Sequence, residues 1–225
     1  MKMVLYPHVI CGVIALFIFI IPLITKKGGR AHVLWGRSYT LCMTVVILGA
    51  FIITPWRFFI DEQRSPKSQE FAVFLLFVAI LSASTLHFGL RALRHKNRTF
   101  KTTKCIDVAP SSLLIATSLL TGLYGILNGS TLLTWIPIAG LLSGVQSLKY
   151  WLTAPTEKMH WWYAHIQGMF GACIATVTAF FVTALPNLMG QEFQASLLLW
   201  LLPSVIMVPI EYFILKNYRV KFGDA

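Results

Sequence analysis

The sequence predicts an all-α polytopic membrane protein, a bundle of seven transmembrane helices. Of its 225 residues, 56% are hydrophobic and only 12% are charged. Apolar runs of about twenty residues recur along the chain, and the tryptophans lie near the ends of those runs. A soluble domain of this size would have about a quarter of its residues charged. We therefore treat residues 1–225 as one membrane domain with seven spans.

Each expected span is an apolar stretch long enough to cross the roughly 30 Å hydrocarbon core as a helix. The expected spans are residues 4–25, 33–55, 71–90, 108–127, 132–152, 162–185 and 197–215. The first is kept as a span, because it has no A-x-A cleavage site and is too long for a signal peptide. Only Asn128, Gly129 and Ser130 separate the fourth span from the fifth, which predicts a tight turn.

The basic residues predict the orientation of the chain. The loops at 26–30, 91–104 and 149–158 and the tail at 216–221 are basic, whereas acidic residues balance the basic ones at 57–70. Because cytoplasmic loops are rich in Lys and Arg, we expect the amino terminus outside and the carboxyl terminus in the cytoplasm. The net charge of +11 is thus assigned to topology and to contact with anionic lipids, and not to nucleic acid.

All seven tryptophans lie at or near a predicted membrane border. Trp35, Trp151, Trp161 and Trp162 are expected at the inner border, and Trp56, Trp135 and Trp200 at the outer one. Tryptophan is enriched at both interfaces of a bilayer, so these positions support the assigned spans independently of hydropathy.

Ionisable side chains inside a membrane are costly, so we take them as candidate site residues. Most are predicted at one depth, the cytoplasmic leaflet, and only His8 of the first span lies toward the outside. The inner-leaflet set comprises His32, Arg37, His87, Lys149, His165 and Glu211.

Two histidines on different spans at one depth suit a bis-histidine haem, so His87 and His165 form the candidate pair. His32 belongs to the same histidine cluster. Met169, one helical turn after His165, is an alternative soft ligand for haem or copper. The function this predicts is binding of haem b or a metal ion, with electron transfer as one use. The competing interpretation is that these histidines are hydrogen-bonded packing groups.

A second hypothesis is a carrier or binding protein for a small anion or a lipid headgroup. Arg37 and Lys149 would supply the charge, and Glu211 would fix the orientation of the ligand. The guanidinium of Arg37 suits carboxylate or phosphate. The competing interpretation is that Arg37 and Lys149 extend to anionic lipids and Glu211 pairs with one of them.

A third hypothesis is an intramembrane zinc hydrolase, since seven spans with inner-leaflet histidines resemble the adiponectin-receptor and alkaline-ceramidase superfamily. Ser84 and His87 match that family weakly. His160 and His165 are five residues apart, instead of the four of its HxxxH pair, so they point in different directions. The four cysteines, Cys11, Cys42, Cys105 and Cys173, have no zinc spacing and are interpreted as small hydrophobic residues.

The span at 162–185 has a small and polar face on the side of His165. Gly168, Ala172 and Thr176 lie on this face. Such faces let helix backbones approach closely in lipid, either within one chain or between the chains of a homo-oligomer.

Three segments carry a resemblance to a known family: KKGGRAHVLWGRSYTLCM from Lys26, HIQGMFGACIATVTAFFVT from His165 and WLLPSVIMVP from Trp200. They resemble bacterial multi-pass membrane proteins with a DUF2306-like domain, and the likeness covers most of the chain. The matching positions are Gly29, His32, Gly36, Arg37, His165, Met169, Thr178 and Trp200. The resemblance implies a multi-pass protein of the bacterial inner membrane and no established activity.

Overall fold

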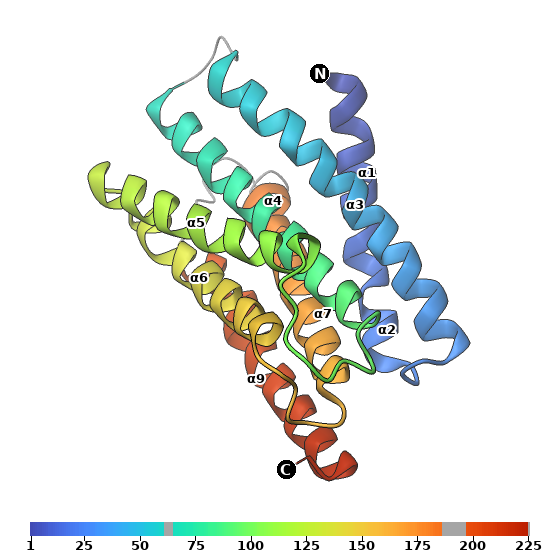
Figure 1. Ribbon diagram of the computed structural model, residues 1–225. Coiled ribbons are helices and arrows are strands. Elements are labelled where there is room, and N and C mark those ends of the chain that lie inside the picture. The colour runs from blue at the N-terminus through green and yellow to red at the C-terminus, as the bar shows by residue number, and fades with distance from the viewer. Residues whose placement is uncertain (61–64, 186–196, 225) are drawn as a thin grey trace. The chain divides into compact units, whose positions relative to one another are not determined.

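The computed structural model describes residues 1–60, 65–185 and 197–224, and all regular secondary structure in these ranges is helical (Figure 1). Seven of these helical segments are long and apolar enough to cross a membrane. The prediction of an all-α fold with seven membrane-spanning helices is confirmed. The orientation of the termini stays a prediction.

The elements follow the predicted spans in order. They are α1 (Lys2–Ile18), α2 (Ile20–Ile24), α3 (Arg30–Phe59), α4 (Pro66–Ala92), α5 (Cys105–Leu127), α6 (Thr131–Leu152), α7 (His160–Ala179), the π-helix η1 (Phe180–Ala184) and α9 (Leu197–Phe222). The first candidate span, Lys2–Ile24, contains α1 and α2, and the sixth, His160–Ala184, contains α7 and η1.

Most helices extend past the predicted spans. Helix α9 continues beyond the expected end at Leu215 to Phe222, and α4 begins at Pro66 instead of Phe71. Hydropathy marks only the part of a helix that lies in hydrocarbon, whereas backbone hydrogen bonding continues into the polar interface. The difference therefore comes from what each criterion measures.

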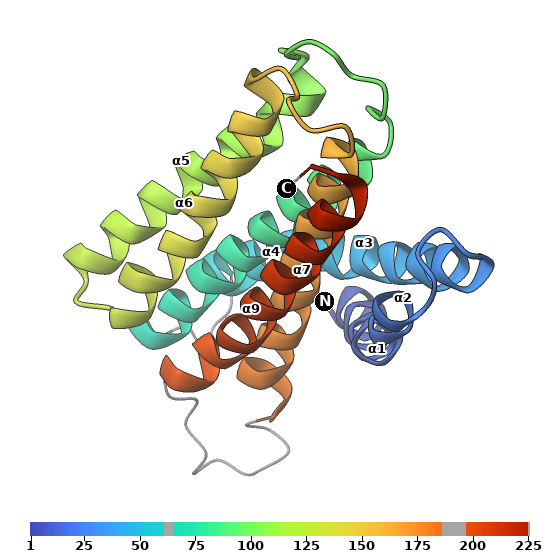
Figure 2. The same cartoon turned by 90° about the horizontal axis from the view of Figure 1, so that it is seen from below.

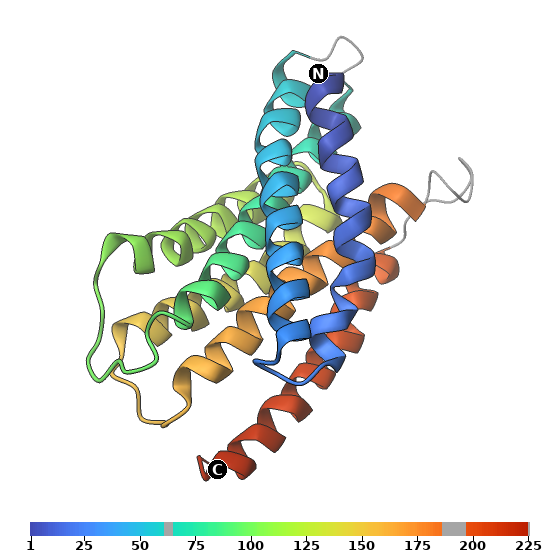
Figure 3. The same ribbon diagram turned by 90° about the vertical axis from the view of Figure 1, so that its right-hand side faces the viewer.

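The chain divides into two compact units, Met1–Ala79 and Ile80–Ala225, and each is described by itself. The prediction of a single domain stays a prediction. In the first unit, α1 lies along α3 (Figure 3). His8 Nδ1 of α1 lies 2.8 Å from the carbonyl oxygen of Val46 in α3. A Cβ added at Gly49 would lie 3.0 Å from the His8 side chain, so glycine at this position leaves room for His8.

In the second unit, α5 and α6 form a closely packed antiparallel pair (Figure 2). Gly129, at φ +66°, makes the turn between them, and Ser130 caps α6 by accepting a hydrogen bond from the Leu133 N–H. The Ser147 hydroxyl donates to Ser111 Oγ across the pair, at 2.9 Å. Small polar residues thus bring two membrane helices together, as they commonly do in lipid.

The remaining helices of the second unit place α7 between the end of α4 and α9. Gly168 of α7 packs on Gly89 of α4, where an added Cβ would lie 2.7 Å from the Thr85 carbonyl oxygen. On another side, α7 packs along α9 (Figure 2). Helix α7 therefore carries buried residues on most of its circumference and contains His165 and Met169.

Candidate functional site

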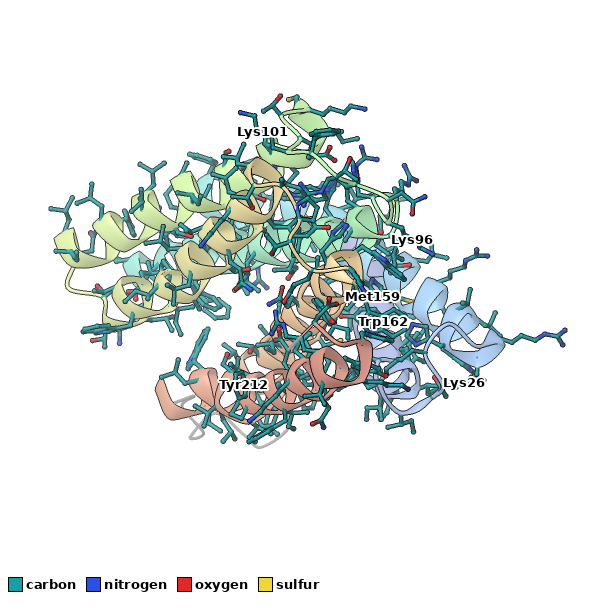
Figure 4. The ribbon with its side chains drawn as sticks, turned by 60° about the horizontal axis from the view of Figure 1, so that its bottom comes forward. Lys26, Lys96, Lys101, Met159, Trp162 and Tyr212 are labelled. Carbon is teal, nitrogen blue, oxygen red and sulfur yellow. The ribbon has the colours of Figure 1, made fainter. Side chains whose placement is uncertain are left out.

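Helices α7 and α9 run antiparallel, and ring contacts near the start of α7 fix their register. The Trp162 ring centroid lies 5.5 Å from that of Tyr218 and 5.8 Å from that of Phe222. The Arg219 guanidinium lies 4.9 Å from the centre of the Tyr163 ring. Figure 4 labels Met159 and Trp162, which mark this end of α7. The first turn of α7 is therefore level with the last turns of α9.

Along α7, the residues that follow Trp162 on this face are potential metal donors. His165, Met169 and Cys173 are spaced four residues apart, so they lie along one side of the helix, close to the line of Trp162. Met169 is half-buried, and Cys173 is 3% exposed. Imidazole, thioether and thiol therefore follow one another along the packed side of one membrane helix.

The facing side of α9 contains Met207 and Glu211. One helical face of α9 carries residues of low exposure at Trp200, Ser204, Met207, Glu211, Leu215, Tyr218 and Phe222. Leu199, Leu202, Pro203, Ile214 and Arg219 are also of low exposure. Their neighbours Ile206, Val208, Ile210 and Tyr212 are exposed. The face that meets Trp162 through Tyr218 and Phe222 is thus the face of Glu211.

Because α7 and α9 are antiparallel and rise equally per residue, counting residues from the Trp162 contact along each helix estimates the depth of Glu211. It is as far from the Tyr218–Phe222 pair along α9 as Gly171 is from Trp162 along α7. Glu211 therefore lies at a depth between Met169 and Cys173, and Met207 is level with the turn after Cys173. We call His165, Met169, Cys173, Met207 and Glu211 the α7–α9 seam.

A hydrogen bond to α4 orients the His165 ring. His165 Nδ1 lies 2.9 Å from the carbonyl oxygen of Gly89. This bond is possible because α4 and α7 approach closely through Gly89 and Gly168. A carbonyl can only accept, so Nδ1 carries the proton in this bond, and the tautomer of a neutral His165 is thereby fixed.

The buried carboxylate of Asp107, near the loop end of the second unit, is paired. Asp107, 1% exposed, accepts from Arg91 Nε at 2.5 Å and from the Thr102 hydroxyl at 3.0 Å. His95 Nε2 lies 3.4 Å from the same carboxylate. Burial lowers the pKa of His95, although Asp107 acts to raise it, and Arg91 and Arg98 act in the same direction as burial. Arg91 is therefore the main countercharge of Asp107.

Asp224, near the end of the chain, caps the loop before α7. Its carboxylate accepts hydrogen bonds from the N–H groups of Lys158 and Met159, at 3.0 and 3.1 Å, and from the Tyr163 hydroxyl at 2.8 Å. Desolvation raises the pKa of Asp224, but these hydrogen bonds and the Lys158 charge outweigh it and hold the pKa below its usual value. This carboxylate anchors the end of α9 to the start of α7.

The structure does not place the His87 side chain beside His165. His87 is two residues before Gly89, which packs on α7, so the two residues point about 160° apart around α4. His87 interacts electrostatically with Arg91 and Asp107. The proposed haem pair therefore has one member on the α7 side of α4 and the other on the side of the Arg91–Asp107 pair.

The other predicted site residues are distributed over both units. His32, whose Nδ1 lies 3.0 Å from the Pro22 carbonyl oxygen, and the exposed Arg37 belong to the first unit. Lys149 is exposed in the last turn of α6. Of the predicted residues, His165 and Met169 lie on α7 and Glu211 lies on α9, two helices that pack together in the second unit.

The residues of the hydrolase hypothesis take part in packing contacts. His160 Nδ1 lies 2.9 Å from the Tyr150 hydroxyl, and the Ser84 hydroxyl donates to the Pro110 carbonyl at 3.1 Å. Within residues 1–60, 65–185 and 197–224, no group of three or more His, Cys, Asp or Glu side chains is placed to hold a metal ion. His165, Cys173 and Glu211 are among the residues searched, so these three side chains do not form one ligand group.

Sequence reasoning missed two residues of the seam. The sequence favours a small hydrophobic role for Cys173 and does not single out Met207. The four-residue spacing of His165, Met169 and Cys173 was the available signal. Met207 had no such signal, because it comes from another helix and depends on the register.

Comparisons with protein-family models, with curated proteins and with solved structures find no match to this chain. The resemblance to proteins with a DUF2306-like domain stays a prediction.

Proposed function

We propose that the protein binds a soft metal ion, Cu(I), within the membrane at the α7–α9 seam. The proposal rests on His165 and Met169 on neighbouring turns of α7, with Cys173 one turn further on, and on the α7–α9 register that the ring contacts of Trp162 indicate. Thioether and thiolate sulfur and imidazole nitrogen are the donors that Cu(I) prefers. The sequence predicts binding of haem or a metal ion, and this proposal keeps the metal ion, with Met169 and His165 as ligands.

The hydrogen bond of His165 supports this role. Histidines that bind metals usually donate one ring N–H to a carbonyl or carboxylate, which orients the ring and makes the other nitrogen a better ligand. His165 Nδ1 has this kind of partner in the Gly89 carbonyl, at 2.9 Å.

The arrangement supports a small ion over haem. The two axial ligands of a haem iron must approach from opposite faces of the porphyrin. His165 and Met169 are on neighbouring turns of one helix and approach from the same side. His87, on another side of α4, would need a rotation of the helix to face His165. Neighbouring turns suit a bare ion, which two side chains of one helix can hold together.

Glu211 would supply the charge balance. It makes no hydrogen bond or ion pair with any residue that the structure describes, although it lies on the packed face of α9. A cation and a carboxylate that neutralise each other cost less in a membrane than either does alone. In this proposal the carboxylate of Glu211 would offset the charge of Cu(I).

The location follows the sequence predictions. We propose a multi-pass protein of the bacterial inner membrane with its carboxyl terminus in the cytoplasm, so that His165 lies in the inner leaflet. The alternative pocket for a small anion would need Arg37, Lys149 and Glu211 together. Lys149 and Glu211 lie on different helices of the second unit, and Arg37 belongs to the first.

The test is an anaerobic titration of the detergent-purified full chain with Cu(I), against a chromophoric Cu(I) chelator. We expect one equivalent to bind. Met169→Leu preserves volume but removes the sulfur, and should weaken binding by at least about tenfold. Met159→Leu, just before α7 and outside the seam, is the matched control and should bind as the unchanged protein does.

Two results would overturn the proposal. One is a protein that competes for no Cu(I). The other is equal binding by Met169→Leu, Cys173→Ser and the unchanged protein. An absorption spectrum of the purified protein tests the haem alternative, because a Soret band lost in His165→Ala and His87→Ala would replace the small ion with haem.

A further inference from the structure

We infer that the loop between α4 and α5, residues 93–104, docks on anionic phospholipid headgroups, with Phe100 as its apolar anchor. The inference is independent of the metal site. Figure 4 shows Lys96 and Lys101 on this loop, at the end of the second unit.

The loop is held in a fixed shape on both sides of Phe100. Arg98 donates to the carbonyl oxygens of Thr153 at 2.8 Å and Tyr150 at 2.9 Å, and its guanidinium lies 4.5 Å from the centre of the Tyr150 ring. The Thr102 N–H donates to the Trp151 carbonyl at 2.8 Å. These bonds attach the loop to the last turn of α6, so Phe100 and Lys101 form a short tip between two fixed points.

Phe100 is 78% exposed at this tip. A large exposed aromatic ring on a fixed loop makes few packing contacts with its own protein. Aromatic side chains are, by contrast, stabilised at the headgroup level of a bilayer. Ile106 in the first turn of α5 and Leu152 in the last turn of α6 are 56% and 44% exposed. Apolar surface therefore begins next to the loop, which indicates that the edge of the membrane lies at this level.

Among the residues that the structure describes, the exposed cations at this end of the second unit have no acidic salt-bridge partner. Exposed basic side chains at this end of the second unit are Arg94, Lys96, Lys101, Lys104, Lys149 and Lys158. The nearby acids are already engaged. Asp107 pairs with Arg91, Glu157 pairs with Arg219 at 2.7 Å, and Asp224 caps the loop before α7. The positive charge of the loop is thus available to an external anion.

A lipid fits this surface better than a free anion does. Lys101 and Lys104 are exposed, so a small anion bound to them would stay hydrated and bind weakly. A bilayer presents many phosphates at once and also takes up the Phe100 ring. Each lysine near an anionic bilayer raises binding by about fivefold, so several together give a strong preference for anionic over neutral lipid.

The test uses the full chain in neutral detergent micelles and follows its thermal unfolding as phosphatidylglycerol or phosphatidylcholine is added. We expect phosphatidylglycerol to stabilise the protein at lower concentration than phosphatidylcholine. Lys101→Gln with Lys104→Gln should weaken the apparent affinity for phosphatidylglycerol by about thirtyfold. Phe100→Ser should weaken it too and should fold normally, because the side chain is exposed.

A second double variant, Lys216→Gln with Lys221→Gln, removes the same charge from the end of α9 and is the matched control. It should lose much less affinity than the loop variant. Equal losses in the two double variants would show a response to net charge alone and overturn the loop assignment. Equal stabilisation by inorganic phosphate would assign the surface to a free anion, and equal effects of the two lipids would also contradict the proposal.

Discussion

The loop end of the second unit and the α7–α9 seam hold their buried polar groups in opposite ways. At the loop end, Asp107 is almost fully buried but has Arg91, Thr102 and His95 around its carboxylate. In the seam, Glu211 lies on a packed helix face and has no hydrogen bond or ion pair with any described residue.

This difference separates architecture from candidate function. A buried charge with a full set of partners joins elements of the fold, as Asp107 joins the end of α4 to the start of α5. A carboxyl group without partners in a membrane helix has a desolvation free energy that no contact in the fold offsets. Such groups commonly mark ion or proton sites. The comparison therefore assigns Asp107 to stability and supports the ligand-binding role that we propose for Glu211.

The largest expected effect is a difference in stability between variants in which one of these two carboxylates is replaced by its neutral amide. Asp107→Asn removes the charge that balances Arg91, whose side chain is only 16% exposed. It should lower the free energy of unfolding by about 3 kcal/mol, because an unpaired buried charge remains. Glu211→Gln removes a charge that has no partner and should leave stability unchanged or raise it. Unfolding of the metal-free protein in mixed micelles with a denaturing detergent measures both.

The double variant Arg91→Gln with Asp107→Asn is the control for the first carboxylate. It should recover part of the loss, because no unpaired charge remains. A loss of stability in Glu211→Gln as large as that in Asp107→Asn would contradict the comparison, since Glu211 would then be a structural group too.

A smaller effect is expected from the contact that positions His165. Gly168→Ala would place a methyl group against the backbone of Gly89 and 2.7 Å from the Thr85 carbonyl oxygen. The helices must separate, which should cost about 2 kcal/mol and lengthen the bond from His165 to the Gly89 carbonyl. Thermal unfolding measures the first effect, and the Cu(I) affinity measures the second.

Gly122→Ala is the matched control for this variant, because an added Cβ there has no atom within 4 Å. It should be neutral or slightly stabilising, since alanine favours the helix. If Gly168→Ala were equally harmless, the close approach of α4 and α7 would not be needed to hold the ring of His165.

The predictability of this chain from sequence also differs between the two regions. Hydropathy located all seven spans, because each hydrocarbon crossing needs its own apolar run. The Asn128–Ser130 turn was predicted from turn chemistry and is confirmed by Gly129 at φ +66°. The two-unit division, with its boundary inside α4, had no sequence signal.

The candidate site was less predictable, because depth in the membrane does not specify which side of a helix a residue occupies. His87 and His165 were paired by depth alone, and the packing of Gly89 on Gly168 shows that His87 points elsewhere. Met169 was predicted from its spacing to His165, which is local to one helix. Met207 depends on the register of α7 against α9, a property of two segments that are distant in sequence.

The smallest expected effect is a pH dependence at the capped loop before α7. The pKa of Asp224 is held below its usual value of 3.8 in the folded protein, chiefly by hydrogen bonds from Tyr163, Lys158 and Met159 that outweigh desolvation. A carboxyl group with a lowered folded-state pKa stabilises the protein above its unfolded-state pKa. That stabilisation is lost as the pH falls through the folded-state pKa. The contribution of Asp224 should therefore be constant at neutral pH and begin to fall below about pH 4.

Thermal unfolding of Asp224→Ala and of the unchanged protein between pH 3 and pH 7 measures this contribution. The difference in midpoint should be largest near neutral pH and should close at the acid end. Tyr163→Phe removes one of the three hydrogen bonds and should lose only part of the difference. A difference that stayed constant down to pH 3 would mean that Asp224 acts through its shape instead of its charge. Since this side chain is partly exposed, its effect should also be smaller than that of Asp107, which would confirm that burial sets the strength of these anchors.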